Sequence, residues 1–346
     1  MKRTTPEEIS MQPEVKREQA GSTAPRESVP SLMRAVVVRR YGGPEVLEHV
    51  EALPVPVPAP GEVLVRVRAT GMNPADVNVR SGQLWVITGR QGPKQPVLGY
   101  DIAGEVVRTS EGWEEGTRVF AMLDMGQAGG AAEYVAVPAR LLARIPPGLS
   151  FEEAAAVPLA ALTAHQSLVD VARLRSGQRV LVRGASGGVG SYAVQLASAL
   201  GAHVTAVASA HNAEWLRGLG AHTVVDYANT PLSALAGPFD VFFDVRGGTP
   251  HREVRPLLTP RGIHVTVMPS YGGFLLAPLL GMVPGPRFAQ PFVKPNGAQL
   301  AELAAKLESG ALRSTLTRTL PFTDIAEAHR ALATGHTRGK LVLRWA

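Results

Sequence analysis

The sequence feature with the clearest chemistry is a group of glycines at residues 184–190. A short apolar strand pattern leads into Gly184-Ala185-Ser186-Gly187-Gly188-Val189-Gly190, and a helical pattern follows. Glycines at 184, 187 and 190 let the chain turn tightly, let a diphosphate approach the backbone and let the helix pack on the strand. The N-terminus of the helix then offers N–H groups and the positive end of its dipole to the phosphates. In this strand–turn–helix–strand setting the loop predicts a dinucleotide-binding site, and an ordinary tight turn is the alternative.

The residues after the next predicted strand bear on which dinucleotide is bound. Units that bind NAD usually place an Asp or Glu there, where it holds the ribose hydroxyls. Here the segment reads VASAHN, and no acidic residue occurs before Glu214. We therefore predict NADPH, with Ser209 and Asn212 as ligands of its 2′-phosphate and His211 or Arg217 as charge partners. For Arg217, a solvent-facing helix surface is the alternative.

Two different patterns of secondary structure surround this loop. From residue 34 to about 146 the chain has short β-rich segments separated by Gly and Pro turns, which is typical of a barrel or sandwich. From about Ser150, strands and helices alternate, which predicts βαβ units and a parallel sheet. We predict strands at 35–38, 62–68, 102–107, 179–182, 203–208, 223–226, 240–244, 262–268, 316–321 and 340–344. We predict helices at 152–171 (divided at Pro158), 187–200, 212–219, 297–309 and 324–334.

Composition limits the classes of protein and of site. The length of 346 residues suggests about two domains. The chain has no Cys, which excludes disulfides, thiolate zinc sites, Cys-ligated iron–sulfur clusters and Cys nucleophiles. The net charge is +6 and the pI is near 9.8, but the Arg residues are scattered, so we expect no nucleic-acid partner. An anionic cofactor or substrate accounts for such a charge equally well.

Residues 1–32 are polar and have no hydrophobic period. Basic and acidic residues are equal in number there, and the apolar run of a signal peptide is missing. We therefore expect a disordered tail and a cytoplasmic protein, and translation from Met33 is an alternative. The apolar stretch at 274–283 is broken by Pro278 and Gly281 and is too short to span a bilayer, so we expect a soluble protein.

Several motifs together carry a resemblance to a known family. They are MRAVVV from residue 33, PGEVLVRVRATGMNPADVNVRSG, PVLGYDIAGEV, GTRVFAM, AAEYVAVP, AAAVPLAALTAHQSL, GASGGVG and the closing HTRGKLVL. Over residues 33–345 the chain resembles the medium-chain dehydrogenase/reductase superfamily, in its zinc-free quinone oxidoreductase branch. Two segments, NPADVNVRSG and GLGAHTVVDY, are most similar to the reticulon-interacting oxidoreductases and their bacterial relatives.

This resemblance implies an α/β fold with two domains. A GroES-like β-barrel substrate domain would comprise residues 33–155 and 290–346. A Rossmann domain with a doubly wound parallel sheet would comprise residues 156–289. The resemblance also implies a cleft between the two domains and, commonly, a homodimer.

The resemblance further indicates chemistry without a metal. Zinc alcohol dehydrogenases of this superfamily carry a Gly-His-Glu motif and Cys ligands, whereas this chain has Gly99-Tyr100-Asp101 and no Cys. Without a Lewis acid to lower the pKa of an alcohol, alcohol oxidation is disfavoured. The expected reaction is hydride transfer from NADPH to a quinone or an α,β-unsaturated carbonyl, because the added charge spreads onto a conjugated oxygen. The alternatives are an enoyl-thioester or 2-alkenal reductase, and a cofactor-binding interaction protein with little turnover.

The resemblance assigns cofactor contacts to positions of this sequence. Asn73 and Thr163 would lie near the nicotinamide, and Tyr227 near the adenosine. The backbone around Val245 and Val267, which follow two predicted strands, would line the nicotinamide pocket. The other positions that would contact the cofactor are Ser186, Gly187, Gly188, Val189 and Lys340. For Lys340, a strand-edge position is the alternative.

The catalytic candidates are Asn73, Asn78 and Tyr100. Many quinone reductases have Tyr where this chain has Asn78, which removes one phenolic donor. Tyr100 can donate to a substrate oxygen, and an aromatic ring that fills the vacant zinc region is the alternative. We identify no clear general acid, so water could supply the proton.

Three further features have two interpretations each. Asp76 can transfer a proton, or it can be a turn residue bonded to local backbone or paired with Arg80. Arg246 can face the cofactor or an anionic substrate group, or it can point to solvent. The loop at 270–295 is expected to shape an apolar pocket or a subunit contact.

Overall fold

The computed structural model describes residues 29–90, 92–94, 96–267 and 285–345, apart from the side chain of residue 87. Residues from Ser31 onward form one compact unit. The apolar stretch at 274–283, most of the loop at 270–295 and nearly all of the predicted tail lie outside the described residues.

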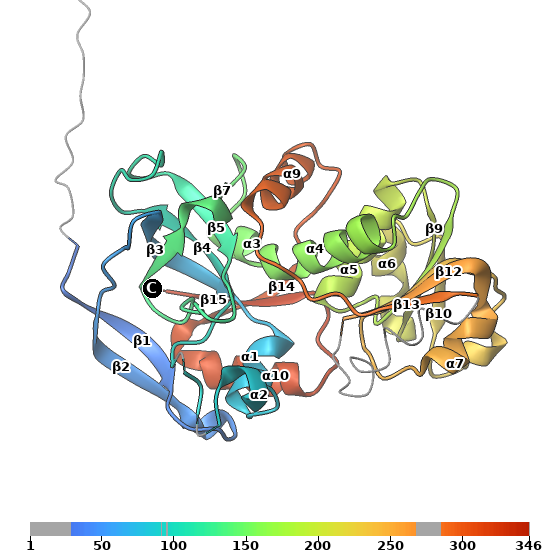
Figure 1. The fold of residues 1–346 in the computed structure, drawn as a ribbon, viewed down its shortest axis with the longest axis horizontal. Helices are drawn as coiled ribbons and strands as arrows, with labels where there is room; N and C mark the ends of the chain where they lie inside the picture. Colours follow the sequence, from blue (N-terminus) through green and yellow to red (C-terminus); the bar gives the residue numbers. More distant parts are fainter. Residues whose placement is uncertain (1–28, 91, 95, 268–284, 346) are drawn as a thin grey trace, which may run out of the picture. The chain divides into compact units, whose positions relative to one another are not determined.

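The first part of the described chain is built on antiparallel strands (Figure 1). A two-stranded ribbon pairs β1 (Leu32–Val38) with β2 (Leu47–Pro54). A larger sheet contains β3 (Glu62–Gly71), β4 (Asp101–Val106), β5 (Arg118–Met122), β6 (Tyr134–Pro138) and β7 (Ala143–Arg144). Alternate residues of β3, namely Val63, Val65 and Val67, are buried in an apolar core. The alternation in EVLVRVR predicts this arrangement, because successive strand side chains point to opposite faces.

Two strands from the C-terminal end of the chain complete this sheet. They are β14 (Leu316–Pro321) and β15 (Lys340–Arg344), and β15 runs antiparallel to β3. The strand order among the described residues is β14-β15-β3-β4-β5-β7, with β6 paired to β3. The chain therefore returns to its first sheet after it has built the second one, and Figure 1 shows β14 and β15 in red beside blue β3.

The second sheet consists of parallel strands. They are β8 (Arg179–Arg183), β9 (His203–Ala208), β10 (Thr223–Asp226), β11 (Phe239–Asp244), β12 (Leu258–Thr266) and β13 (Arg287–Ala289). Their order is β10-β9-β8-β11-β12-β13, and each neighbouring pair is parallel. The strand order reverses between β8 and β11, which is the position where ligands bind in open α/β sheets. The predicted α/β fold with a doubly wound parallel sheet is confirmed.

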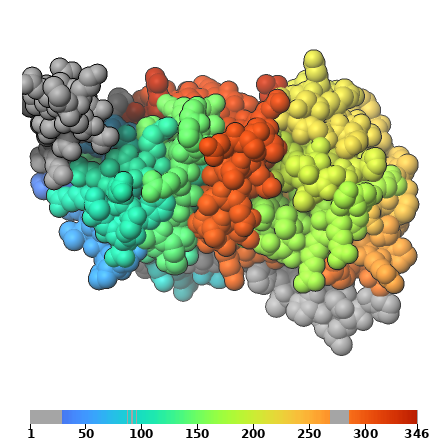
Figure 2. All heavy atoms as spheres, turned by 90° about the horizontal axis from the view of Figure 1, so that it is seen from above, coloured from blue at the N-terminus to red at the C-terminus, as the bar shows by residue number. Residues whose placement is uncertain are grey.

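Apolar residues cover both faces of the parallel sheet. Val180 and Val182 of β8 pack in one core cluster with residues of α4 (Pro158–His165) and α5 (Gly188–Ala199), whereas Leu181 packs in a second cluster with residues around α7 (His251–Val254). The alternation along β8 thus places helices on both faces. α9 (Gly297–Glu308) packs against both β7 and α4, and Figure 2 shows it in orange.

The start of the helical region agrees with the sequence prediction. Ser150 caps α3 (Phe151–Ala155): its Oγ accepts from the Glu153 N–H at 3.1 Å, and a Glu153 carboxylate oxygen accepts from the Ser150 N–H at 2.9 Å. The helical pattern divides at Pro158, as predicted, because proline lacks the N–H that would continue the helix. Residues Gln166–Val171 continue α4 as a π-helix. The strand predicted at 262–268 instead begins at Leu258, as β12.

The remaining α-helices among the described residues are short. They are α1 (Pro74–Arg80), α2 (Trp85–Thr88), α6 (Ala213–Gly218) and α10 (Ile325–Ala333). Within the part of the chain that the structure describes, no helix has both the length and the apolar character that a membrane crossing requires.

Candidate functional site

The backbone of the glycine loop accounts for its glycines. Gly184 follows β8 with a φ of +79°, a conformation that residues with a Cβ rarely adopt. A Cβ at Gly190 would lie 2.2 Å from the Gly184 carbonyl oxygen and 2.7 Å from the Cα of Ala185. Only glycine therefore lets the first turn of α5 approach the end of β8 this closely.

The amides at the N-terminus of α5 are suited to an anion. Gly187 is the N-cap of this helix, and the first N–H to bond back within it is that of Ser191, which donates to Gly187 O at 2.9 Å. No backbone acceptor among the described residues meets the N–H groups of Gly188, Val189 and Gly190. A diphosphate fits such a set of unpaired donors, which the dipole of a 12-residue helix reinforces.

A turn near the C-terminus of the chain contacts this loop directly. The Gly339 N–H donates to Ser186 O at 2.8 Å, and Gly339 forms a parallel bridge with Gly187. A Cβ at Gly188 would lie 2.8 Å from Cδ of Lys340, so the aliphatic stem of that lysine lies against the loop. The turn before β15 is thus attached to the predicted diphosphate site.

The Lys340 side chain ends in a buried polar cluster. Its ammonium donates to Met72 O at 3.0 Å, to Asn73 Oδ1 at 2.6 Å and to Asp101 Oδ2 at 2.9 Å. The Lys340 and Asp101 side chains are only 4% and 0% exposed. These three bonds use all three hydrogens of an ammonium group. Lys340 is therefore buried at the first position of β15, and its predicted contact with the cofactor stays a prediction.

Both the oxygen and the nitrogen of the Asn73 side-chain amide are hydrogen-bonded. Its Oδ1 accepts from Lys340, and its Nδ2 donates to Asp101 Oδ2 at 2.9 Å and to Gly71 O at 3.2 Å. Because an amide has two hydrogens, neither is left for a substrate unless this network rearranges. The second Asp101 oxygen accepts from the Leu159 N–H at 2.6 Å, so α4 also contacts the cluster.

Asp76 and Tyr100 lie beside this cluster. Asp76 is buried, and its carboxylate accepts from the Asn73 N–H at 2.8 Å and from the Gly99 N–H at 3.1 Å. Burial raises the pKa of Asp76 to about 7; the two N–H donors oppose this shift, and the charge of Asp101 adds to it. The contacts agree with the interpretation of Asp76 as a residue bonded to local backbone.

The other catalytic candidates have different surroundings. Tyr100 is 2% exposed and packs with apolar residues such as Val38 and Val79, and burial raises the pKa of its phenol. This agrees with an aromatic ring that fills space. Asn78 lies on α1 and is half-buried. The catalytic roles of Asn73, Asn78 and Tyr100 stay predictions.

The residues predicted around the nicotinamide come from several elements. Thr163 is buried in α4, and its hydroxyl donates to Leu159 O at 2.7 Å. Val245 and Val267 follow β11 and β12 and are half-buried. Arg246 is exposed.

A second buried carboxylate organises the turn after β11. Asp244 accepts from Arg183 Nη1 at 3.1 Å, from the Gly247 N–H at 2.9 Å and from the Thr249 N–H at 3.2 Å. Arg183, which ends β8 next to the glycine loop, was not among the residues predicted from the sequence. The sequence feature that could have pointed to Arg183 is its position between the predicted strand at 179–182 and Gly184.

The predicted ligands of the adenosine end lie after β9 and β10. Ser209 Oγ donates to the Tyr227 hydroxyl at 2.8 Å, and Tyr227 is 50% exposed. Asn212 is buried, with its Nδ2 3.2 Å from His211 Nε2. Ser209 and Tyr227 thus come together at the surface, whereas the Asn212 side chain lies beneath it.

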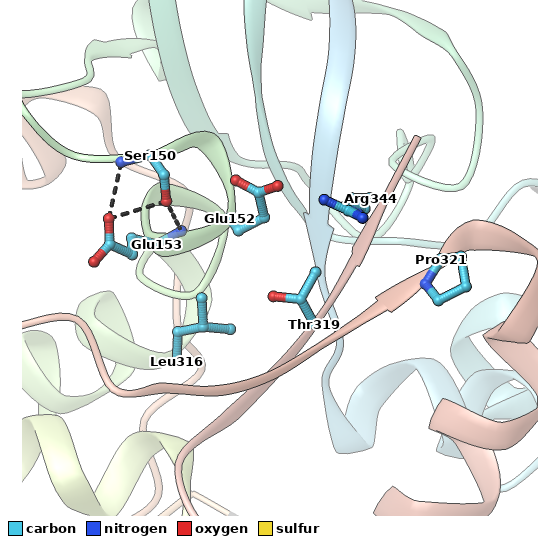
Figure 3. A pocket seen from close by; sticks show the side chains of 7 residues that line it. All are labelled: Ser150, Glu152, Glu153, Leu316, Thr319, Pro321 and Arg344. Atoms are coloured by element: carbon cyan, nitrogen blue, oxygen red, sulfur yellow. Dashed lines mark hydrogen bonds between the residues drawn. The ribbon is translucent and has the colours of Figure 1, made fainter. Parts of the chain in front are cut away.

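Two surface cavities lie away from the cluster. Figure 3 shows one of about 500 Å³ between the start of α3 and β14–β15. Its lining residues are Ser150, Glu152, Glu153, Leu316, Thr319, Pro321 and Arg344. The other, of about 460 Å³, is lined by Tyr41, Ser81, Gly82, Trp85 and Arg90. Neither cavity includes a residue of the glycine loop, and we assign the candidate site by the loop and the buried cluster.

Comparison with known proteins finds relatives along most of the chain. Residues 59–147 match the family described as alcohol dehydrogenase GroES-like domain, and residues 219–343 match the family described as zinc-binding dehydrogenase. The chain is 30% identical over 364 residues to NAD(P)H oxidoreductase RTN4IP1, mitochondrial, of Bos taurus, covering 93% of this chain and 91% of that protein. It is 34% identical over 331 residues to NADPH-dependent alkenal/one oxidoreductase, chloroplastic, of Arabidopsis thaliana, covering 91% and 80%. The solved quinone oxidoreductase from Coxiella burnetii has a TM-score of 0.79 and 29% identity, covering 90% of this chain and 99% of that chain.

The residues of this chain do not fit a zinc ion at the Gly99-Tyr100-Asp101 motif. The chain has no Cys, and thiolates are common ligands of zinc in proteins. Both Asp101 oxygens already accept hydrogen bonds, and one of the donors is the Lys340 ammonium. A divalent cation at that carboxylate would be repelled by the buried positive charge.

Proposed function

This chain belongs to the medium-chain dehydrogenase/reductase superfamily, in its quinone oxidoreductase branch, and on that premise we propose that it is a metal-free reductase that uses NADPH to reduce a quinone or an activated α,β-unsaturated carbonyl. The observation that carries the proposal is the contact of the glycine loop with the turn before β15. That contact brings a set of unpaired amide donors next to the buried cluster around Lys340.

The chain's own residues bind and orient the cofactor in this proposal. The N–H groups of Gly188, Val189 and Gly190 hold the diphosphate. The backbone after β11 and β12 and the side chain of Thr163 position the ring, which supplies the hydride when the cofactor is bound. The Lys340–Asp101 pair holds the Asn73 side chain in one orientation.

The charge on the reduced acceptor is stabilised mainly by the acceptor itself. A quinone or an enone spreads the added electron pair onto a conjugated oxygen, so positioning can account for much of the catalysis. The buried Asp76 is enclosed by backbone donors and is not placed to give up a proton to a substrate. We therefore propose water, rather than Asp76, as the source of the proton.

The names of relatives support both halves of the proposal. The Arabidopsis protein is called an NADPH-dependent alkenal/one oxidoreductase, and the Coxiella protein is called a quinone oxidoreductase. The proposed preference for NADPH rests on the turn after β9, where Ser209 stands and no acidic residue occurs before Glu214. The Ser209 hydroxyl donates to the hydroxyl of Tyr227, which follows β10. A cytoplasmic location and a homodimer stay predictions.

One experiment distinguishes this function from its alternatives. Oxidation of NADPH by the purified full chain is measured with a benzoquinone, a naphthoquinone, an alkenal and crotonyl-CoA. We expect turnover with the quinones or the alkenal. Turnover with crotonyl-CoA alone would favour an enoyl-thioester reductase, and tight NADPH binding without any turnover would favour an interaction protein. The absence of saturable affinity for both NADPH and NADH would overturn the assignment.

A further inference from the structure

Arg338 lies in the turn before β15 and has an unusual partner. Its guanidinium carbon lies 5.1 Å from the centroid of the Trp215 ring, in a cation–π contact. The Arg338 side chain is exposed, and no ion pair joins it to a carboxylate in the described ranges. Its positive charge is therefore not neutralised by the protein around it.

The elements around Arg338 place it at the adenosine end of the predicted cofactor site. The next residue, Gly339, donates its N–H to Ser186 O in the glycine loop. Trp215 lies in the first turn of α6, which directly follows the turn after β9. The ribose of the adenosine lies at this turn in dinucleotide-binding units of this type. Arg338 thus lies between the loop that would hold the diphosphate and the turn that would hold the ribose.

Two further contacts fix Arg338 in this place. The Thr317 hydroxyl donates to Arg338 O at 2.6 Å, which anchors the backbone of the turn to β14. The Trp215 ring is half-buried and packs against the main apolar core, so the surface on which the guanidinium rests is itself held in place. An arginine held in this way loses less side-chain freedom when it binds a phosphate.

The charges at this turn favour a doubly charged phosphate. His211 and Arg217 are exposed on the same segment, and Glu214 is the only acidic residue between β9 and the end of α6. Arginine donates two parallel hydrogen bonds to a phosphate, which makes it more selective than a hydroxyl such as that of Ser209.

We propose that Arg338, resting on Trp215, is a specificity-determining residue that binds the 2′-phosphate of NADPH. This inference depends on the proposed function, because it assumes that the glycine loop binds a dinucleotide. It assigns the main charged contact to a residue about 130 positions away from the β9–α6 turn in sequence, rather than to Arg217.

Binding of two probes that differ only in the 2′-phosphate tests this inference without turnover. Calorimetry of the full chain measures the affinities for adenosine 2′,5′-bisphosphate and for 5′-AMP. We expect the wild-type chain to prefer the bisphosphate by about 10- to 100-fold, the range of a charge-assisted hydrogen bond. Arg338→Gln should remove most of this preference and change the affinity for 5′-AMP by less than about twofold.

Two further variants serve as controls. Arg217→Gln tests the other candidate arginine, which is exposed on α6. It should lower the preference much less than Arg338→Gln does, because the attraction of a solvent-facing charge is screened. Trp215→Leu should lower the preference partly, because Arg338 keeps its charge but loses the ring on which it rests.

The outcomes separate this inference from the proposed function. Equal weakening of both probes by Arg338→Gln would show that Arg338 contacts a part of the nucleotide other than the 2′-phosphate. Either of two other results would also overturn the inference: an unchanged preference in Arg338→Gln, or a loss of preference in Arg217→Gln. Neither result would contradict the proposed function, which NADPH oxidation tests. A wild-type chain that binds neither probe nor NADPH would overturn the proposed function itself.

Discussion

At the scale of single residues, the main finding is the buried pair of Lys340 and Asp101. Removing two charges from water costs several kcal/mol, and the pair compensates this cost only because its remaining donors and acceptors are also bonded. Here Met72 O, Asn73 Oδ1 and the Leu159 N–H provide those partners. The pair thus fixes the orientation of Asn73, which makes Lys340 and Asp101 positioning residues in the proposed reaction.

We predict that Lys340→Met lowers the free energy of unfolding by about 3–5 kcal/mol, because it leaves the Asp101 carboxylate buried without its ammonium partner. Urea unfolding of the full chain measures this loss. The control is Arg318→Met, which removes an ion pair between exposed side chains, Arg318 and Glu327, and should cost no more than about 1 kcal/mol. Equal unfolding midpoints for Lys340→Met and wild type would contradict the interpretation of this pair.

At the scale of elements, the junction of β8 and α5 positions the amides that are proposed to bind the cofactor. The strand ends at Arg183, the chain turns at Gly184, and the helix begins at Gly188. The close approach of Gly190 to Gly184 sets the position of the helix, and therefore the positions of the amides at its N-terminus. The contact of Gly339 with Ser186 adds a second constraint from the other end of the chain.

We predict that Gly190→Ala displaces α5 and lowers the free energy of unfolding by about 1–3 kcal/mol, since its methyl group would overlap the backbone of Gly184 and Ala185. The affinity for NADPH should fall as well, because the amides move. Gly218→Ala is the matched control: no atom lies within 4 Å of a Cβ at this helical position. Because Gly218 is the last residue of α6, where alanine gains less than in the middle of a helix, the variant should change the free energy of unfolding by no more than about 0.5 kcal/mol. Undiminished NADPH binding by Gly190→Ala, measured by fluorescence titration, would argue against the assigned diphosphate site.

At the scale of the whole molecule, two buried histidines make the fold sensitive to acid. His264 lies in β12 and His329 lies in α10. Among the described residues, neither ring nitrogen of either histidine has a hydrogen-bond partner. Burial lowers the pKa of His264 to about 4 and that of His329 to about 3, because the charged imidazolium would lose its hydration. The charge of Arg80 lowers the pKa of His329 further.

The sign of the resulting pH dependence follows from these pKa values. Below about pH 6.5 the imidazole of His329 binds a proton in the unfolded chain but not in the folded chain, so acid favours unfolding. We predict that the free energy of unfolding of wild type, relative to His329→Leu, falls by about 1.4 kcal/mol per pH unit from about pH 6.5 towards pH 3. Denaturant unfolding at several pH values measures this difference.

His336→Leu is the control, since His336 is exposed, and it should follow wild type. A constant difference between wild type and His329→Leu would contradict the prediction.

Features that depend on neighbouring residues could be predicted from the sequence alone. The glycine loop, the cap at Ser150 and the division at Pro158 each follow from backbone requirements that are satisfied within a few residues. The parallel sheet followed from the alternation of strands and helices, and the bonding of Asp76 to nearby backbone was one of the stated alternatives. Strand limits were less accurate, as at β12, because a strand extends as far as its neighbour provides partners.

The tertiary structure alone decided which distant residues share one environment. Lys340 is 239 residues from Asp101, and its burial follows from the pairing of β15 with β3 and from the contact of Gly339 with Ser186. The contact of Arg338 with Trp215 has the same origin. The spacing of residues along a chain does not encode such contacts, because the cost of burying a charge depends on what the folded chain places around it.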